Sequence, residues 1–286
     1  GNQIEVATYG TDGELIGDYS EIAIERNTYD GLGNVIETSK YGTDGELYDP
    51  YGYGAFFKYK YDANNYKIEE RIFGADGELL KSEACIKKYK YDERGNTIEE
   101  ASYGDDERLL ENYSGVAIYR YIFDENNRTI EESKYGADEK LVSSDDDYYS
   151  DPVIAITRYK YDDNGNEIER AYFDSNEEYV ADYYGVAIFR QKYDNDSRVI
   201  EKANYNEYQE LLNDEYSYEY PLVRYKYSND EYADNFWAPI EEAIYDAEGM
   251  LTNLKKYEGY DLIEESFYQN NILKNNEDGI AIIRNE

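Results

Sequence analysis

The residues of this chain that could do chemistry are carboxylates in a recurring setting. Nine times an Ile is followed by Glu and, five positions after the Ile, by Tyr or Phe. These glutamates are Glu5, Glu37, Glu69, Glu99, Glu131, Glu169, Glu201, Glu241 and Glu264. Carboxylate pairs can hydrolyse glycosides, but a chain with 65 Asp and Glu residues contains such pairs everywhere. Recurrence at equivalent positions indicates a structural role for these glutamates better than it indicates one active site.

Other catalytic groups are scarce in this sequence. There is no His, which removes Ser-His-Asp and Cys-His triads, imidazole zinc ligands and the usual general base near neutral pH. The single cysteine, Cys85, cannot form an internal disulfide, and in its strand-like stretch we expect a small buried side chain. We therefore expect no enzymatic activity and no obligatory cofactor.

The elements that position the glutamates are predicted to be β-hairpins. The Ile-Glu phrases recur about every 32 residues, a period typical of repeat arrays. In each copy, β-branched and aromatic residues precede an Asp- and Gly-containing turn such as 30–33, in which Asn65 and Asn127 replace Gly in two other copies. A second turn at Asp44 and Gly45 leads to a short segment containing Leu47. The prediction is an all-β fold, a solenoid-like array of about nine ~32-residue β-hairpin repeats.

The domain organisation follows from where the period is kept. We expect a single elongated array over residues 1–286, with regular units at about 1–142 and 153–227. An acidic insertion at 143–152 interrupts it, and the C-terminal units at 228–286 are degenerate.

A cation recurs on the first strand of the copies, at Arg26, Lys58, Lys88, Arg120, Arg158, Arg190, Arg224 and Arg284. A two-residue loop would place Arg26 opposite Glu37, whereas a bulge at Gly33 would place it opposite Thr38. The second register sets like charges opposite each other in two hairpins, so the first is favoured. The sequence predicts a structural ladder of partly buried pairs, which are Arg26–Glu37, Arg120–Glu131, Arg158–Glu169 and Arg190–Glu201.

Small and aromatic residues also keep fixed places. The position three after each Ile is Ala or Ser in all copies but one, where it is Arg71. We expect it to leave room for an aromatic ring of a neighbouring unit, which would explain the 38 Tyr residues without a ligand. Exposed Tyr rows would favour a binding function, and buried Tyr with open terminal edges would favour assembly.

The net charge of −36 restricts the partners. A phosphate backbone or an anionic membrane would be repelled, so we expect no nucleic-acid binding. No apolar run is long enough for a membrane-spanning helix, and we expect no membrane insertion. Self-association or a cell-surface partner is expected, and a neutral glycan or a basic protein is compatible with the charge.

Calcium is the one metal that the sequence offers ligands for. Asp145, Asp146, Asp147 and Asp151 in the acidic insertion could supply oxygens, as could the turn at 194–196. A solvated acidic loop is the competing interpretation.

The two ends of the chain carry incomplete copies. The first residues read as a second strand without a first strand, and the last residues read as a first strand without a second. One interpretation is a segment of a longer array. The other is head-to-tail assembly by strand addition, with Ile4, Val6, Ile280 and Ile282 as the assembly edges.

The stretches Tyr59–Asp62, Tyr89–Asn96 and Tyr159–Asn166 share the core Tyr-x-Tyr-Asp-x-x-Gly-Asn, in whole or in part. This core resembles bacterial YD (Rhs-type) repeats. The resemblance implies hairpin stacks at the cell surface or in secreted toxins, where they form shells or stalks. We therefore expect a non-catalytic extracellular or cell-surface structural protein, such as a fibre, stalk or filament subunit. The alternatives are an adhesin-like or glycan-binding module that uses Tyr and carboxylate rows, and a segment of a secreted toxin shell.

Overall fold

The computed structural model describes residues 2–19, 21–81, 84–143, 154–212, 220–228, 237–275 and 280–284. The chain divides into two compact units, Gly1–Ser144 and Asp145–Glu286. Their boundary falls inside the stretch expected as an acidic insertion. Every regular element of the described residues is a β-strand, as predicted, and none of them forms a helix that could cross a membrane.

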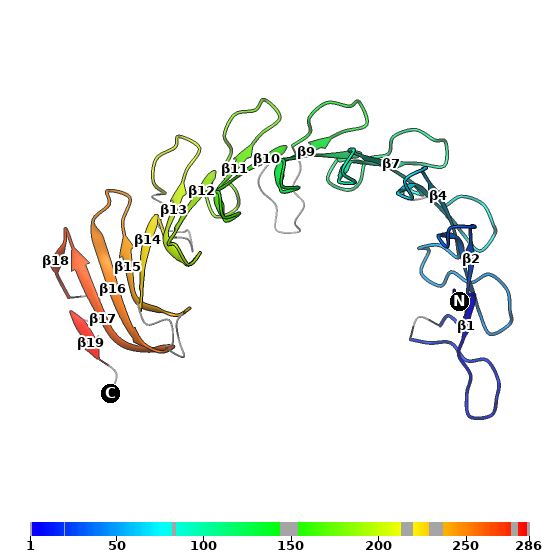
Figure 1. The fold of residues 1–286 in the computed structure, drawn as a ribbon, viewed down its shortest axis with the longest axis horizontal. Coiled ribbons are helices and arrows are strands. Elements are labelled where there is room, and N and C mark those ends of the chain that lie inside the picture. Colours follow the sequence, from blue (N-terminus) through cyan, green and yellow to red (C-terminus); the bar gives the residue numbers. More distant parts are fainter. Residues whose placement is uncertain are drawn as a thin grey trace. The chain divides into compact units, whose positions relative to one another are not determined.

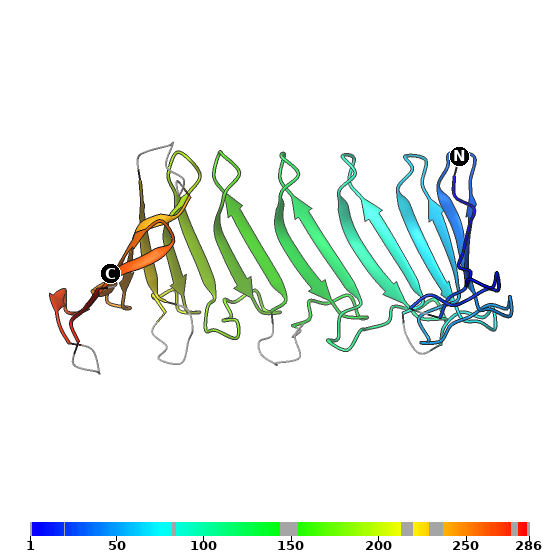
Figure 2. The same cartoon turned by 90° about the horizontal axis from the view of Figure 1, so that it is seen from below.

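In unit 1 each strand pairs with the next in antiparallel fashion (Figure 1). The strands are β1 (Glu5–Ala7), β2 (Ile24–Tyr29), β3 (Val35–Tyr41), β4 (Phe56–Tyr61), β5 (Lys67–Phe73), β6 (Ile86–Tyr91), β7 (Thr97–Tyr103), β8 (Ile118–Phe123) and β9 (Thr129–Tyr135). Hairpin tips lie along one edge of the sheet, and the loops between hairpins lie along the opposite edge (Figure 2). We call the second of these the loop edge.

Unit 2 follows the same plan and then departs from it. Its strands are β10 (Ile156–Tyr161), β11 (Glu167–Phe173), β12 (Ile188–Tyr193), β13 (Val199–Tyr205), β14 (Leu222–Tyr227), β15 (Pro239–Tyr245), β16 (Leu251–Glu258), β17 (Asp261–Gln269), β18 (Ile272–Leu273) and β19 (Ile282–Arg284). From β15 to β17 the strands form a continuous meander, and both β18 and β19 pair with β17. The degenerate C-terminal sequence is therefore still built as antiparallel sheet.

The hairpin tips close as the Asp and Gly positions predict. In the β6–β7 tip, the Asp92 carboxylate accepts hydrogen bonds from the backbone N–H groups of Arg94 and Asn96, both at 2.9 Å. Gly95 has φ +89°, and Asn65 and Asn127 have φ +73° and +62° at the equivalent position. Asn is the commonest replacement for Gly in this left-handed region. The prediction that Asn substitutes for Gly in these turns is confirmed.

The short third segment is also confirmed. Leu15, Leu47, Leu79 and Leu109 each form an antiparallel bridge with the aromatic residue that ends the Ile-Glu phrase. The bridge returns the chain toward the first strand of the next hairpin.

The core is thin and consists of small and aliphatic side chains. In unit 1, Ala101, Ala117 and Ile118 are buried together, and Tyr103, Leu109 and Tyr135 pack against them. Ala101 lies opposite Ile118 of the next hairpin, whereas Ser39 lies opposite Phe56 of the next hairpin, so the small residue faces an aliphatic side chain in one copy and an aromatic ring in another. Cys85 is fully buried, as expected for a small apolar side chain. Full burial of an Ile such as Ile86 stabilises the fold by about 1.5–3 kcal/mol.

Hairpin tips alternate in chemistry along the chain. Those of β2–β3, β6–β7 and β10–β11 end in Gly-Asn, whereas those of β4–β5, β8–β9 and β12–β13 have Asn or Ser followed by Tyr or Arg. The Asn96 side chain donates to Asn127 of the following tip at 2.9 Å. Tyr66 lies against Gly95 of the following tip, where a Cβ atom would be 2.3 Å from its hydroxyl oxygen. The structural period of these tips is therefore two hairpins.

Candidate functional site

The recurrent glutamate lies between two cations, as Glu99 on β7 shows. Nζ of Lys90, in the same hairpin, is 2.7 Å from Oε1, and Nε of Arg120, in the next hairpin, is 2.8 Å from Oε2. The Glu99 side chain is only 13% exposed. One carboxylate thus ties both strands of its hairpin to the first strand of the next. We call this arrangement the glutamate bridge.

The glutamate bridge recurs in both units. Its contacts to the next cation are Arg26–Glu5 at 2.7 Å, Arg190–Glu169 at 2.7 Å, Arg224–Glu201 at 2.8 Å and Arg284–Glu264 at 2.9 Å. Its contacts to the hairpin's own Lys are Lys60–Glu69 at 2.6 Å, Lys160–Glu169 at 2.7 Å and Lys192–Glu201 at 2.7 Å. The predicted ladder exists, but it runs from one hairpin to the next.

The predicted pairing within each hairpin is therefore wrong. Arg26, Arg120, Arg158 and Arg190 lie opposite the small residues Ser39, Ser133, Ala171 and Ala203. The reason is the length of the tip: the Asp30 N–H donates to the Asn34 carbonyl, and the register shifts again between Thr28 and Tyr29. The two registers predicted from the sequence, with Arg26 opposite Glu37 or opposite Thr38, both assumed a loop shorter than the one that the structure has.

The remaining members of the predicted ladder have other neighbours. Glu37 lies opposite Thr28 in its own hairpin and opposite Lys58 in the next, and Glu131 lies opposite Ile122. Arg158 contacts Glu177 at 2.8 Å, in the loop that follows its own hairpin.

Six of the first-strand cations lie within 5 Å of the centroid of the aromatic ring that ends their own hairpin. The ring-centroid distances are 4.7 Å for Arg26–Tyr41, 4.3 Å for Lys88–Tyr103, 4.3 Å for Arg120–Tyr135, 4.6 Å for Arg158–Phe173, 4.8 Å for Arg190–Tyr205 and 4.9 Å for Arg224–Tyr245. The ring supports the cation at a position from which it can reach the preceding hairpin.

The contacts of Arg71 explain why one copy has a large residue at the position three after the Ile, where the other copies have Ala or Ser. Its Nε is 2.7 Å from Glu69, and its terminal nitrogen is 2.9 Å from Glu107. Arg71 therefore gives Glu69 the second cation that the next hairpin's Arg supplies to Glu99.

The bridge keeps its carboxylates ionised. Burial acts to raise the pKa of Glu99, but hydrogen bonds from Lys90 and Arg120 outweigh it, and the pKa lies below its ordinary value of 4.5. The same balance lowers the pKa values of Glu69, Glu169 and Glu201. A general acid requires the opposite shift.

A second ladder, which sequence reasoning missed, joins hairpins near their tips. The Tyr91 hydroxyl donates to the Lys67 carbonyl of the preceding hairpin at 2.7 Å. Equivalent bonds are Tyr29 to Gln3, Tyr61 to Val35, Tyr193 to Glu167 and Tyr227 to Val199. The available sequence signal for this ladder was the Tyr that precedes the tip Asp at Tyr29, Tyr61, Tyr91, Tyr161 and Tyr193. The signal for the Lys of the glutamate bridge was a Lys two positions after the first-strand cation, at Lys60, Lys90, Lys160 and Lys192.

One face of unit 1 carries a groove between two hairpins, of about 490 Å³. Tyr89, Tyr91, Tyr121 and Phe123 line it together with Glu100, Glu132, Asn96, Thr97 and Thr129. All nine of these residues are partly buried. Burial raises the pKa of Tyr89, so its hydroxyl stays protonated.

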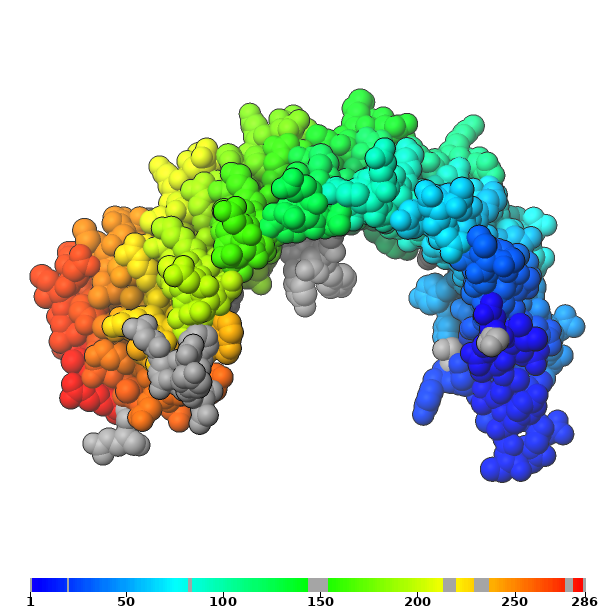
Figure 3. All heavy atoms as spheres, in the orientation of Figure 1, coloured from blue at the N-terminus to red at the C-terminus, as the bar shows by residue number. Residues whose placement is uncertain are grey.

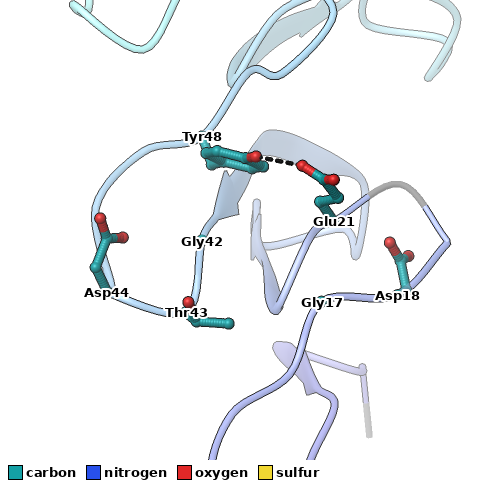
Figure 4. A pocket seen from close by; sticks show the side chains of 7 residues that line it. All are labelled: Gly17, Asp18, Glu21, Gly42, Thr43, Asp44 and Tyr48. Carbon is teal, nitrogen blue, oxygen red and sulfur yellow. Dashed lines mark hydrogen bonds between the residues drawn. The ribbon is translucent and has the colours of Figure 1, made fainter.

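A smaller cavity of about 330 Å³ lies at the loop edge of unit 1 (Figure 4). It is lined by Gly17, Asp18, Glu21, Gly42, Thr43, Asp44 and Tyr48. The Tyr48 hydroxyl donates to Glu21 at 2.6 Å, and this hydrogen bond raises the pKa of Tyr48. Every charged side chain that lines the cavity is a carboxylate.

The calcium prediction falls largely outside the described residues, which do not include Asp145, Asp146, Asp147 and Asp151. Among residues that the structure does describe, no group of three or more potential acidic, His or Cys ligands could hold a metal ion. At 194–196, Oδ1 of Asp194 accepts hydrogen bonds from the backbone N–H groups of Asp196 and Arg198. Oδ2 of Asp194 accepts a hydrogen bond of 2.8 Å from Nε of the Arg198 side chain. That carboxylate is occupied by its own turn.

The predicted assembly edges are solvent-exposed strands. Ile4 is 68% exposed and Val6 43%, next to and within β1, and Ile280 and Ile282 are 41% and 37% exposed near and within β19. Within the described residues, β1 pairs only with β2, and β19 pairs only with β17.

Comparison with known proteins gives a loose likeness only. No model of a protein family and no curated protein matches the chain. Among solved structures, it is similar to TcdB2-TccC3-TEV at 15% identity and TM-score 0.29, over 96% of this chain and 15% of that one. TcdB2-TccC3-Cdc42 matches at 13% identity and TM-score 0.30, over 92% of this chain and 14% of that one. TcdB2-TccC3 without its hypervariable C-terminal region matches at 14% identity and TM-score 0.30, over 91% of this chain and 14% of that one. The chain thus spans about one seventh of the length of these proteins, and no residue role is transferred from them.

Proposed function

We propose that this chain is a non-catalytic structural element, an array of β-hairpins that forms a wall or stalk in an extracellular or cell-surface assembly. The observation that carries the proposal is the glutamate bridge. The complete bridge, Glu with the Lys of its own hairpin and the Arg of the next, is present at Glu99 in unit 1 and at Glu169 and Glu201 in unit 2. Contacts that repeat in this way extend an array.

The chemistry of the bridge supports a structural role. Glu99, Glu169 and Glu201 each contact two cations and have lowered pKa values. They are acceptors already saturated by the fold, whereas a catalytic carboxylate needs access to substrate and a pKa near the working pH. The resemblance of the tip core to YD repeats supports the extracellular or surface location.

Within this role we propose strand addition as the route of assembly. Within the part of the chain that the structure describes, β1 pairs only with β2 and β19 only with β17, and an exposed strand edge is a template for another strand. The exposed apolar side chains of Val6 and Ile282 would be covered by such pairing.

Negative-stain electron microscopy over a range of protein concentrations tests the assembly. Rods that lengthen with concentration and carry a regular axial repeat are expected. The Ala7→Pro variant should shorten them, because the backbone of Ala7 lies on an edge strand and Pro cannot donate a hydrogen bond. Single particles of constant size at every concentration would overturn strand addition.

A second candidate function, glycan binding, is favoured by the groove lined by Tyr89, Tyr121, Glu100 and Glu132. Aromatic faces next to carboxylate and amide groups are suited to a neutral oligosaccharide. Titration calorimetry with neutral oligosaccharides tests it: measurable heat that Glu132→Gln abolishes would support glycan binding, and no heat with any of them would count against it.

A further inference from the structure

The loops between hairpins present tyrosines in a way that the strands do not. Four of these loops turn around a residue whose side chain accepts backbone N–H groups: Asp18, Asp49, Asn112 and Asp182. Asn112, for example, accepts from Ser114 and Val116, both at 3.0 Å. Such bonds fix the local backbone, so the side chains on these turns are held in place.

The turns carry exposed rings. In unit 1, Tyr19 and Tyr113 are fully exposed, and Tyr51 and Tyr53 are 58% and 68% exposed. In contrast, the strand tyrosines Tyr59, Tyr61 and Tyr91 are half-buried. A large ring in water contributes little to its own fold. Rigid Tyr side chains supply contact area at low entropic cost and are enriched in binding surfaces for that reason.

The charge around Tyr19, Tyr51 and Tyr53 has one sign. Within residues 10–22 and 42–54, which include Tyr19, Tyr51 and Tyr53, every charged residue is Asp or Glu. The cavity with Asp18, Glu21 and Asp44 lies in the same part of the loop edge (Figure 4). The N-terminal residues, dark blue in Figure 3, project at the end of unit 1. The loop edge therefore joins aromatic faces to carboxylates, without an intervening cation in these two loops.

The fold itself shows what this combination holds. Arg26 lies over the Tyr41 ring and pairs with the Glu5 carboxylate, and Arg120 does the same with Tyr135 and Glu99. An aromatic face and a carboxylate are the two groups that this chain uses to fix a guanidinium. At the loop edge both groups face solvent.

We propose that the loop edge of unit 1 is a docking surface for an arginine- or lysine-rich segment of a partner protein. Tyr19, Tyr51 and Tyr53 stack against its side chains. The acidic cavity beside Tyr48 receives one of its cations. Charge complementarity selects this occupant over nucleic acids and anionic lipids, which the same carboxylates repel.

Fluorescence anisotropy with a labelled oligo-arginine peptide tests the proposal on the full chain at physiological salt. Replacing Tyr19, Tyr51 and Tyr53 by Ser leaves the net charge unchanged. We expect this variant to bind at least about tenfold more weakly, because each cation–aromatic contact contributes about 0.5–1 kcal/mol at exposed sites. Thermal melting of each variant confirms that it folds.

A matched pair of charge variants separates the loop edge from general attraction to an acidic chain. Glu14→Gln/Glu21→Gln/Glu46→Gln removes three charges at the loop edge, and Glu93→Gln/Glu125→Gln/Asp163→Asn removes three at hairpin tips. Binding should weaken several-fold more in the first than in the second. Equal losses in the two, full binding by the Tyr-to-Ser variant, or no binding by the original chain would overturn the proposal. Chitohexaose, a neutral oligosaccharide, tests the alternative. If the original chain binds it in place of the peptide and the Tyr-to-Ser variant does not, the loop edge is a carbohydrate-binding surface and the docking proposal is overturned.

Discussion

At the scale of single residues, the contacts of the two carboxylate oxygens give the recurrent glutamate a structural role at Glu99, Glu169 and Glu201. One oxygen of Glu99 faces the Lys of its own hairpin, and the other faces the Arg of the next. Half-burial strengthens these charge-assisted hydrogen bonds compared with exposed ion pairs, which contribute little.

Replacing Glu99 with Gln is expected to lower the free energy of unfolding by about 1–2 kcal/mol, since two charged hydrogen bonds are weakened. Urea denaturation followed by circular dichroism measures the loss. The control is Glu93→Gln at an exposed tip, for which a change within about 0.5 kcal/mol is expected. Equal losses in the two variants would mean that the bridge does not stabilise the array.

Acid should weaken the array through the same groups. The pKa values of Glu69, Glu99, Glu169 and Glu201 lie below the ordinary value of 4.5, so their contribution is complete above that pH. It is lost as the pH falls through the lowered values, because the unfolded chain binds protons first. Melting temperatures measured from neutral pH downward should fall below about pH 4.5, and the difference between the original chain and Glu99→Gln should shrink there. A difference that stays constant into acid would contradict this assignment.

At the scale of elements, the hairpin tip shows what the sequence could and could not predict. The Asp, Gly and Asn positions predicted the turn and its positive φ values, because these depend on neighbours within a few residues. The register was wrong because the Asp30–Asn34 bond and the shift at Thr28 depend on how many residues the closed loop holds. The partner of each Arg was wrong for the same reason: a contact to the preceding hairpin cannot be derived from one hairpin alone.

Three Gly-to-Ala variants separate backbone strain from crowding at the tips and loops. Gly31 lacks a positive φ and has open space where a Cβ atom would lie, Gly77 has φ +77° with open space, and Gly95 has φ +89° with Tyr66 close by. We expect Gly31→Ala to be neutral or slightly stabilising, Gly77→Ala to cost about 1 kcal/mol, and Gly95→Ala to cost more than that. Thermal melting ranks the three. Equal effects at Gly77 and Gly95 would show that Tyr66 does not constrain its neighbour's tip.

At the scale of the whole molecule, the tips repeat every two hairpins, a feature that one consensus for all copies conceals. The spacing from Ile36 to Ile68, from Ile98 to Ile130 and from Ile168 to Ile200 is constant at 32 residues. The intervening spacings, from Ile68 to Ile98, Ile130 to Ile168 and Ile200 to Ile240, are 30, 38 and 40. The spacing is therefore constant within the two-hairpin modules, whereas between them it is either shorter or longer at these three places.

Deleting residues 68–129 removes one such module and joins two equivalent second strands. The shortened chain is expected to unfold cooperatively, because every remaining tip keeps a neighbour of the kind that it has now. Deleting residues 36–67 removes a single hairpin and would place the Gly-Asn tips of 30–34 and 92–96 side by side. The free energy of unfolding of this second variant should be about 1 kcal/mol lower than that of the 68–129 deletion, because one side-chain hydrogen bond between tips is lost. Equal melting temperatures would argue against the two-hairpin module.

The coupling of one hairpin to the next is tested most directly by a pair of double-mutant cycles on Arg120. One cycle combines Arg120→Met with Glu99→Gln of the preceding hairpin, and the other combines it with Glu131→Gln of its own hairpin. An interaction energy of about 1–2 kcal/mol is expected for Arg120 with Glu99, and less than about 0.5 kcal/mol for Arg120 with Glu131. The reverse order would place the ion pairs inside single hairpins and contradict an array held together by its glutamate bridges.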